Sequence, residues 1–190
     1  MKTSLIAIAL IIASIVQVNA QDTANLDIQK SNLYWMGSSF MGFNNHHGTV
    51  KFKEGYVNLT NGKISGGEFT IDMNTITNLD GKGYNEGLVE HLKNEDFFFT
   101  FRYPTAQLTI TQVDYIDANT ITIKADLIIK SIKKPVKFTA LLDYDKKEML
   151  TNFDIDRTRW NILHATEFDT KIKNNMISDT IEFKAQLIFK

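Results

Sequence analysis

The amino-acid sequence predicts an all-β domain of antiparallel strands with one short helix. Apolar and polar side chains alternate with a period of two along much of residues 26–190, which is the pattern of strands with one buried face. Asn61-Gly62 stands between two apolar stretches and is typical of a two-residue hairpin turn. No linker or repeat interrupts the chain, so we expect a single domain over residues 21–190.

The alternation also predicts which side of each strand is buried. In residues 121–129 and 181–189 the odd-numbered positions are apolar, and the same holds for the shorter stretches 69–73 and 97–103. In residues 136–144 the even-numbered positions are apolar. We expect these faces to point into the domain, because successive side chains of a strand point to opposite sides of the sheet.

A helical stretch interrupts the strands near residues 84–95. Tyr84, Leu88, Val89 and Leu92 recur at roughly helical spacing. We expect a short amphipathic helix there, with its one apolar stripe lying against the sheet.

Six or more antiparallel strands can be arranged in two ways. They pack as a two-sheet sandwich or close into a barrel, and the alternation alone does not choose between these arrangements. A barrel of about eight strands has an interior just wide enough for packed side chains or one small ligand.

The N-terminus has the features of a secretory signal peptide. Lys2 is followed by an apolar run from Leu5 to Val16, and Val18-Asn19-Ala20 offers small side chains at the cleavage site. The run is too short to cross a membrane as a helix. We expect cleavage between Ala20 and Gln21, a periplasmic or secreted protein, and no stable membrane insertion afterwards.

Composition excludes several classes of function. The formal charge of −1 leaves no basic excess, so we expect no nucleic-acid partner. The absence of cysteine excludes disulfides, cysteine zinc sites, iron–sulfur clusters and a thiol nucleophile. The adjacent His46 and His47 would point to opposite faces of a strand, so we expect no metal site and no other cofactor.

Three clusters of polar and aromatic residues stand out. The first joins Trp35-x-Gly37 to His46-His47-Gly48, the second spans residues 90–98, and the third, residues 154–160, holds two acids, two arginines and a tryptophan. Taken singly, each can be a salt-bridged strand end, because structural ion pairs form such clusters too.

Taken together and in order, these clusters resemble the YceI-like family of polyisoprenoid-binding, lipocalin-like proteins. The resemblance covers nearly the whole chain after the leader, from about Leu26 to Lys190. It is carried by the following motifs: Trp35-x-Gly37, His47-Gly48-Thr49-Val50, Gly66-Gly67-Glu68-Phe69, Ile71-Asp72-Met73, His91-Leu92-Lys93-Asn94, Asp96-Phe97-Phe98, Tyr103-Pro104-Thr105-Ala106, Lys133-Lys134-Pro135-Val136, Asp156-Arg157-Thr158 with Trp160, and Ser178-Asp179-Thr180-Ile181. The sequence departs from the family pattern at Ala125, Ser131 and Asn161, where the family favours glycine, and at Ile128, where it favours threonine.

The resemblance implies an extended antiparallel barrel of about eight strands with an elongated apolar interior. That interior would hold a long-chain amphiphile: a polyisoprenoid, an isoprenoid quinone or a fatty-acid-like lipid. The resemblance implies no catalytic residues, and we expect a binding protein rather than an enzyme.

Under this interpretation the candidate site residues fall into two groups. The first lines the tunnel: Phe69, Ile71, Phe97, Phe99, Phe101, Ile123, Leu127, Ile129, Phe138, Trp160, Phe183 and Leu187. The second would bind a polar head at the mouth through charge-assisted hydrogen bonds: His91, Lys93, Arg157 and Arg159. We expect Trp35, like Trp160, near the interior or as a plug.

Two alternatives stay open at this point. A filled-core barrel could act through its surface as a protein-interaction module. A hydrolase or isomerase could use His91 or His47 with Asp96 or Asp156, which requires a His–carboxylate hydrogen bond in a pocket that solvent reaches. A barrel closed on itself can be a monomer, and a homodimer is also compatible with the sequence.

Overall fold

The computed structural model describes residues 21–39, 45–81, 85–165 and 177–190. The predicted signal peptide, residues 1–20, lies outside the described residues. The strands are β1 (Gln21–Asn25), β2 (Asn32–Ser39), β3 (Asn45–Thr60), β4 (Lys63–Asp72), β5 (Thr105–Tyr115), β6 (Thr120–Ile129), β7 (Ile132–Asp143), β8 (Glu148–Asp156) and β9 (Ile177–Ile188). The helices are α1 (Asn85–Lys93) and two 3₁₀ turns, η1 (Met73–Thr75) and η2 (Arg157–Trp160).

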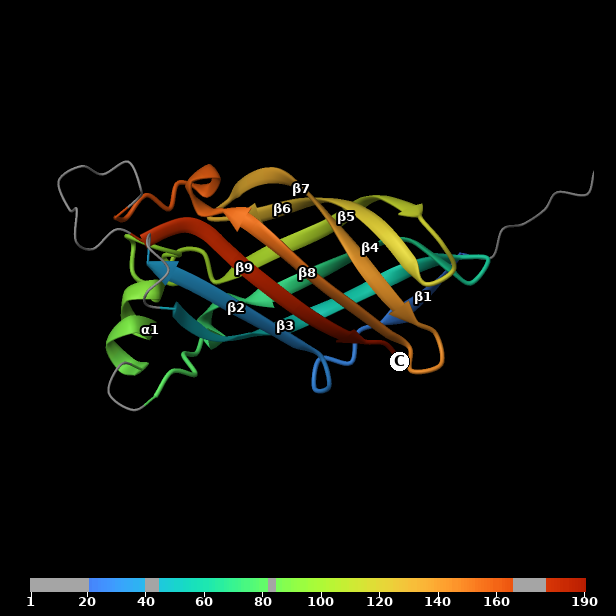
Figure 1. Ribbon diagram of the computed structural model, residues 1–190, viewed down its shortest axis with the longest axis horizontal. Coiled ribbons are helices and arrows are strands. Elements are labelled where there is room, and N and C mark those ends of the chain that lie inside the picture. Colours follow the sequence, from blue (N-terminus) through green and yellow to red (C-terminus); the bar gives the residue numbers. More distant parts are fainter. Residues whose placement is uncertain (1–20, 40–44, 82–84, 166–176) are drawn as a thin grey trace, which may run out of the picture.

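The strands close into an antiparallel barrel (Figure 1). Neighbours follow the order β3-β2-β9-β8-β7-β6-β5-β4, and the pairing of β4 with β3 completes the ring. The long strand β3 pairs with β2 through its first half and with β1 through its last residues, so β1 and β2 share one position in the barrel. The predicted all-β fold is confirmed. Of the two arrangements that the sequence allows, the structure shows the eight-stranded barrel and not the sandwich.

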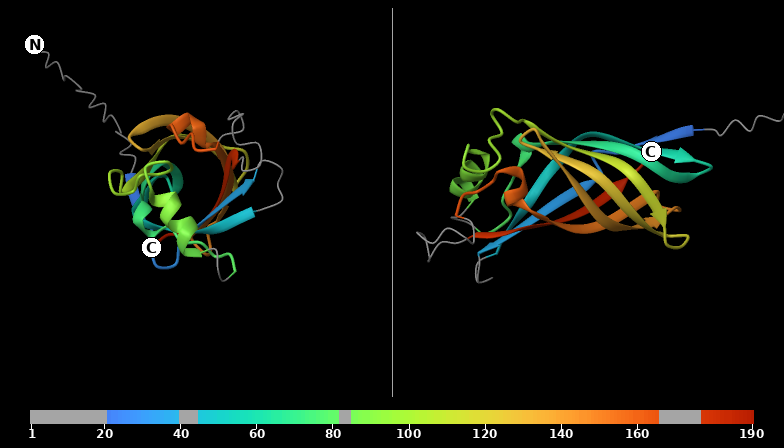
Figure 2. Two further views of the ribbon diagram at one scale, coloured as in Figure 1. Left: turned by 90° about the vertical axis from the view of Figure 1, so that its left-hand side faces the viewer. Right: turned by 90° about the horizontal axis from the view of Figure 1, so that it is seen from above.

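The connections at the two ends of the barrel differ in size. Because antiparallel strands alternate in direction, the β4–β5, β6–β7 and β8–β9 connections leave the barrel at the same end. The β4–β5 connection carries η1 and α1, and the β8–β9 connection carries η2. Figure 2 shows α1 lying in front of this end, which is called the helix end below. Two residues of the predicted apolar stripe face inward, with Leu92 buried and Leu88 packed against the core, and Tyr84 lies outside the described residues.

The inward faces follow the alternation in four of the five stretches. Side chains at odd positions of 121–129 are all buried, and those of 69–73 and 181–189 are buried or, at Phe183, packed against the core. The even face of β7 is buried as far as Leu142. It ends there because β7 ends at Asp143, and Tyr144 is exposed.

The prediction of a strand at residues 97–103 is wrong. This segment forms turns after α1. Its amides donate to carbonyls at the C-terminus of α1 and within the segment itself, and not to a neighbouring strand. The amides of Phe98 and Thr100 donate to the carbonyls of Leu92 and Lys93, at 3.1 and 3.0 Å. Phe97 is therefore buried, whereas Phe101 is 94% exposed.

Several turns use the left-handed backbone region without glycine, and two of them bear on the family pattern. Lys130 and Ser131, which connect β6 to β7, have φ of 50° and 62°. Asn161, which ends η2, has φ of 61°. Ser131 and Asn161 are two of the positions at which the sequence departs from glycine, so the backbone geometry that favours glycine is retained with other residues.

Candidate ligand-binding cavity

The barrel encloses a cavity of about 450 Å³. Every strand from β2 to β9 contributes to its wall, and α1, η1 and η2 contribute at the helix end. The side chains that border it are mostly Leu, Ile, Phe, Met and Val. They come from the inward faces described above, because the period-two alternation puts one side of every strand inside a barrel.

Most of the predicted apolar lining residues border this cavity. They are Phe69, Ile71, Phe97, Ile123, Leu127, Ile129, Phe138, Phe183 and Leu187. Phe99, Phe101 and Trp160 do not border it. Phe99 packs edge-on against Tyr103, with ring centroids 6.1 Å apart, and Phe101 faces solvent. Trp160 is completely buried beside the cavity, where its Nε1 donates to the Leu127 carbonyl at 3.1 Å.

An aromatic row on the inner wall includes a residue that sequence reasoning missed. Phe153 of β8 stacks on Phe138 of β7 and on Phe183 of β9, with ring centroids 4.7 and 5.4 Å apart. All three rings border the cavity. The alternation of Met149, Thr151 and Phe153 was a signal that could have identified this face of β8.

Of the four residues proposed for a polar mouth, His91 and Arg157 border the cavity and Lys93 and Arg159 do not. Arg159 lies outside, where its guanidinium donates to the Pro135 carbonyl and covers the ring of Trp160.

Arg157 is completely buried, and its donors are engaged by the protein itself. Its Nε and Nη2 donate to the carbonyls of Ser178 and Ile177, each at 3.0 Å, and Nη1 donates to that of Ile162 at 2.8 Å. Nη2 also lies 3.1 Å from Oδ1 of Asp179. The guanidinium thus ties η2 to the start of β9, and the carboxylate of Asp179 compensates its charge.

A histidine pair borders the cavity near Arg157. The rings of His91 and His164 meet edge to face with centroids 4.6 Å apart, and both lie close to the ring of Phe97. Burial and the neighbouring His164 lower the pKa of His91, against the opposing effect of Asp96. His164 was not predicted to reach the cavity, because residues 157–165 show no regular period that would place it.

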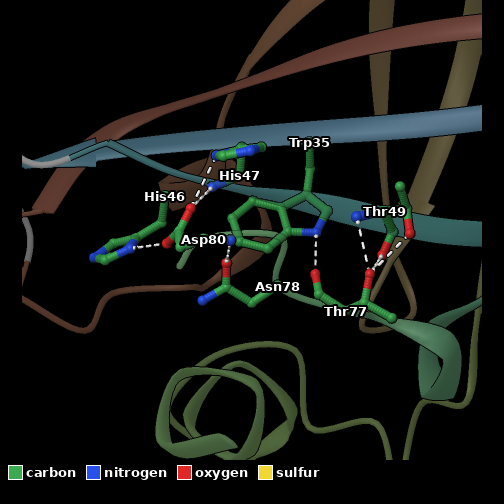
Figure 3. A network of polar contacts seen from close by, with 7 residues as sticks. All are labelled: Trp35, His46, His47, Thr49, Thr77, Asn78 and Asp80. Atoms are coloured by element: carbon green, nitrogen blue, oxygen red, sulfur yellow. Dashed lines mark hydrogen bonds and ion pairs between the residues drawn. The ribbon is translucent and has the colours of Figure 1, made fainter. Parts of the chain in front are cut away.

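A second polar cluster, at the edge of β3 that the chain after η1 covers, joins two adjacent histidines to one carboxylate (Figure 3). His46 Nδ1 lies 2.5 Å from Oδ2 of Asp80, and His47 Nδ1 lies 2.9 Å from Oδ1. The His47 amide also donates to Oδ1. Partial burial would raise the pKa of Asp80, but the hydrogen bonds from His46 and His47 outweigh it and leave the pKa below its ordinary value.

This convergence corrects part of the sequence interpretation. Adjacent side chains do leave a strand on opposite faces, yet both imidazoles reach Asp80 because it lies beside the strand edge. In the described part of the chain, no three His, Asp or Glu side chains form a group that could hold a metal ion. His46 also borders the cavity, so the cluster lies at the wall of the candidate site.

Trp35 is fixed next to this cluster by the chain that follows η1 (Figure 3). Its Nε1 donates to the Thr77 carbonyl at 3.1 Å, and the Thr77 amide donates to the Thr49 carbonyl at 2.9 Å. Trp35 borders the cavity, which agrees with the expected position near the interior. Gly48 leaves the space for this contact, since a Cβ there would lie 1.8 Å from the Thr77 oxygen.

A closed antiparallel barrel around an apolar cavity defines a lipocalin-like class of protein. Comparison with known families makes this more specific. The chain matches the YceI-like domain over residues 25–189 and belongs to the YceI-like family. No helix in the described residues is both long and apolar enough to span a membrane.

Relatives and solved structures agree with this assignment. UPF0312 proteins of Pseudomonas putida strains F1 and W619 are each 24% identical over 110 residues, which are 58% of this chain and 56% of theirs. The match therefore spans little more than half the length of these relatives. BcnA of Burkholderia cenocepacia aligns with a TM-score of 0.69 and 18% identity over 86% of this chain and 98% of its own. The YceI protein of Campylobacter jejuni aligns with a TM-score of 0.53 and 19% identity over 67% of this chain and 74% of its own. At these identities the two structures share the fold.

Proposed function

We propose that the protein binds a long-chain apolar amphiphile inside the barrel and carries or sequesters it. The candidate ligands are polyisoprenoids, isoprenoid quinones and fatty-acid-like lipids. The observation that supports this most strongly is the cavity of about 450 Å³, whose wall is formed mostly by apolar side chains of β2 to β9. Its size lies within the range of roughly 300–1,000 Å³ that is usual for small-molecule sites.

The energetics favour a ligand with a long apolar chain. Each buried methylene contributes about 0.8 kcal/mol, and association costs roughly 4–15 kcal/mol. A ligand that buries about fifteen such groups gains about 12 kcal/mol from them. The number of buried carbons should therefore set the affinity more than any single polar contact.

The same arrangement gives little support to catalysis. The pairs considered for an enzyme were His91 or His47 with Asp96 or Asp156. In the described residues none of these pairs is joined by a hydrogen bond or an ion pair, and the Asp156 side chain instead accepts from Thr158 at the start of η2. The third alternative, an interaction module, requires a filled core, and the cavity favours ligand binding over it.

The place of action is part of the proposal. The apolar leader and its small residues before Gln21 support export to the periplasm or the medium, with cleavage between Ala20 and Gln21. We propose that the exported barrel holds its ligand without nucleic acid, metal or other cofactor.

A pair of substitutions on adjacent residues of β9 tests the binding site. Ala185 borders the cavity and Lys184 points outward. The neutral fluorescent probe N-phenyl-1-naphthylamine should bind the unsubstituted protein and the Lys184→Phe variant alike. Ala185→Phe fills part of the cavity and should weaken probe binding at least tenfold. Equal binding by both variants would place the probe outside the barrel, and no binding by any of the three proteins would contradict the proposed function.

A further inference from the structure

We propose that the helix end of the cavity is a site for an uncharged polar head, such as a hydroxyl or a carbonyl, and that it disfavours carboxylate and phosphate heads. This inference rests on the proposed function and narrows its ligand class. Fatty-acid-like ligands with an ionised head would then bind much more weakly than alcohols, amides or quinones with the same chain.

Among the described residues that border the cavity, Arg157 is the only Lys, Arg, Asp or Glu. Without compensation, a buried guanidinium would attract an anion strongly. Here the Asp179 carboxylate lies 3.1 Å from Nη2 and supplies the opposite charge.

The donor nitrogens of the Arg157 guanidinium are directed at acceptors of the protein itself. Its Nε, Nη1 and Nη2 donate to the carbonyls of Ser178, Ile162 and Ile177. An anionic head would have to displace these acceptors to form the bidentate contact that makes arginine a good carboxylate or phosphate ligand. Nε, Nη1 and Nη2 of Arg157 are therefore all engaged by acceptors of the protein itself.

The other polar side chains that the structure describes at this end are imidazoles and hydroxyl-bearing residues. His91 and His164 border the cavity beside Phe97, and the hydroxyls of Ser178 and Thr180 border it from β9. A neutral imidazole offers one donor and one acceptor, and a hydroxyl offers both. These groups suit a head that needs one or two hydrogen bonds and no counter-charge.

An ionised head at this end would lose more free energy of hydration than its contacts with these side chains would recover. A charge that leaves water for an apolar site must be paired to be tolerated. Of the lysines that the structure describes in the connections at this end, neither Lys93 nor Lys130 borders the cavity. Within the described wall, an anionic head therefore finds no cation other than the paired Arg157.

Competition between two ligands with the same chain tests this assignment. Farnesol and farnesoic acid would displace N-phenyl-1-naphthylamine from the whole mature protein at pH 8, where the acid is ionised. Partition of the same two compounds into uncharged phosphatidylcholine vesicles gives the preference of a plain apolar phase. We expect the protein to prefer farnesol at least as strongly as the vesicles do.

A charge-removing substitution makes the test specific for the Arg157–Asp179 pair. Asp179→Asn keeps the size of the side chain and removes the negative charge that lies 3.1 Å from Nη2, so farnesoic acid should bind about tenfold more tightly while farnesol changes less than twofold. Asp126→Asn is the matched control, because it removes the same charge from an ion pair with Lys133 on the outside of the barrel and should change neither affinity.

The outcomes separate the two proposals. If farnesol and the probe bind, but the protein favours farnesoic acid more than the vesicles do, or folded Asp179→Asn leaves the ratio unchanged, the head assignment is wrong and the proposed function stands. If Asp179→Asn does not fold, the comparison of the unsubstituted protein with vesicles decides alone. If neither ligand nor the probe binds, both proposals are wrong.

Discussion

The indole of Trp35 occupies the space that a side chain at Gly48 would need: a Cβ on Gly48 would lie 2.7 Å from Nε1 of the indole. The two residues stand opposite each other in the β2–β3 pairing, and the indole bonds to the Thr77 carbonyl that passes over the glycine. A tryptophan on one strand, a glycine on its neighbour and a distant loop are thereby fixed together at the cavity wall.

Gly48→Ala should destabilise the protein by about 2–3 kcal/mol, because the new methyl group would collide with the Thr77 carbonyl, which is backbone and cannot rotate away. Gly37→Ala is the control on the same sheet, since a Cβ at Gly37 would have nothing within 4 Å of it. Chemical denaturation measures both. A Gly48→Ala variant as stable as Gly37→Ala would mean that the loop is not held against β3.

Ser131→Gly should stabilise the protein by about 1 kcal/mol, because Ser131 has a φ of 62°, where a side chain costs energy and glycine does not. Ser131→Ala keeps the Cβ and should not stabilise. The difference in melting temperature between the two variants is the measurement. A gain for alanine equal to that for glycine would show that the hydroxyl, and not the backbone conformation, is responsible.

Arg157→Met should cost about 3–5 kcal/mol, because it removes the buried partner of Asp179 and of three carbonyls. Arg159→Met, two residues away and exposed, should cost less than about 1 kcal/mol. Urea unfolding of the two variants compares them directly. Equal losses would contradict the structural role assigned to Arg157.

Acidification should weaken the fold through His91 before it affects Asp80. The pKa of His91 is lowered in the folded protein by burial and by His164, so the unfolded chain binds a proton first as the pH falls below about 6.5. The contribution of His91 to the stability of the fold is fully present above that pH and declines below it. The pKa of Asp80 is also lowered, and its contribution is present above about pH 3.9 and is lost as the pH falls further.

The pH dependence of unfolding between pH 8 and 5, measured for the unsubstituted protein and for His91→Phe, separates the first effect. The decline between about pH 7 and 5 should be smaller in the variant. An unchanged decline would assign it to other groups.

The parts of the fold that could be predicted from the sequence are those with a local cause. Residues 121–129 are buried on one side because strand geometry alone dictates which positions share a face. The alternating phenylalanines at 97, 99 and 101 mislead, because the carbonyls of the preceding helix bind the amides of this segment. Closure into a barrel needed the family resemblance, since the alternation is the same in a sandwich.

The site was predictable to the same extent. Apolar lining residues such as Ile123 and Phe183 follow from the strand faces. The contact of Asp80 with His46 and the approach of His164 to His91 depend on the paths of long connections, which no local pattern specifies. The role of Arg157 depends on Asp179, which is 22 positions away in the sequence. Asp179 lies among the first residues of β9, and the path of the β8–β9 connection places it beside Arg157.

The most direct test of ligand binding is native mass spectrometry of the exported protein purified from its own host, followed by organic extraction. We expect a bound mass of one apolar amphiphile per barrel, which is released into the organic phase and identified there as a molecule with an uncharged head. A protein that carries no hydrophobic molecule and takes up no long-chain probe would contradict it.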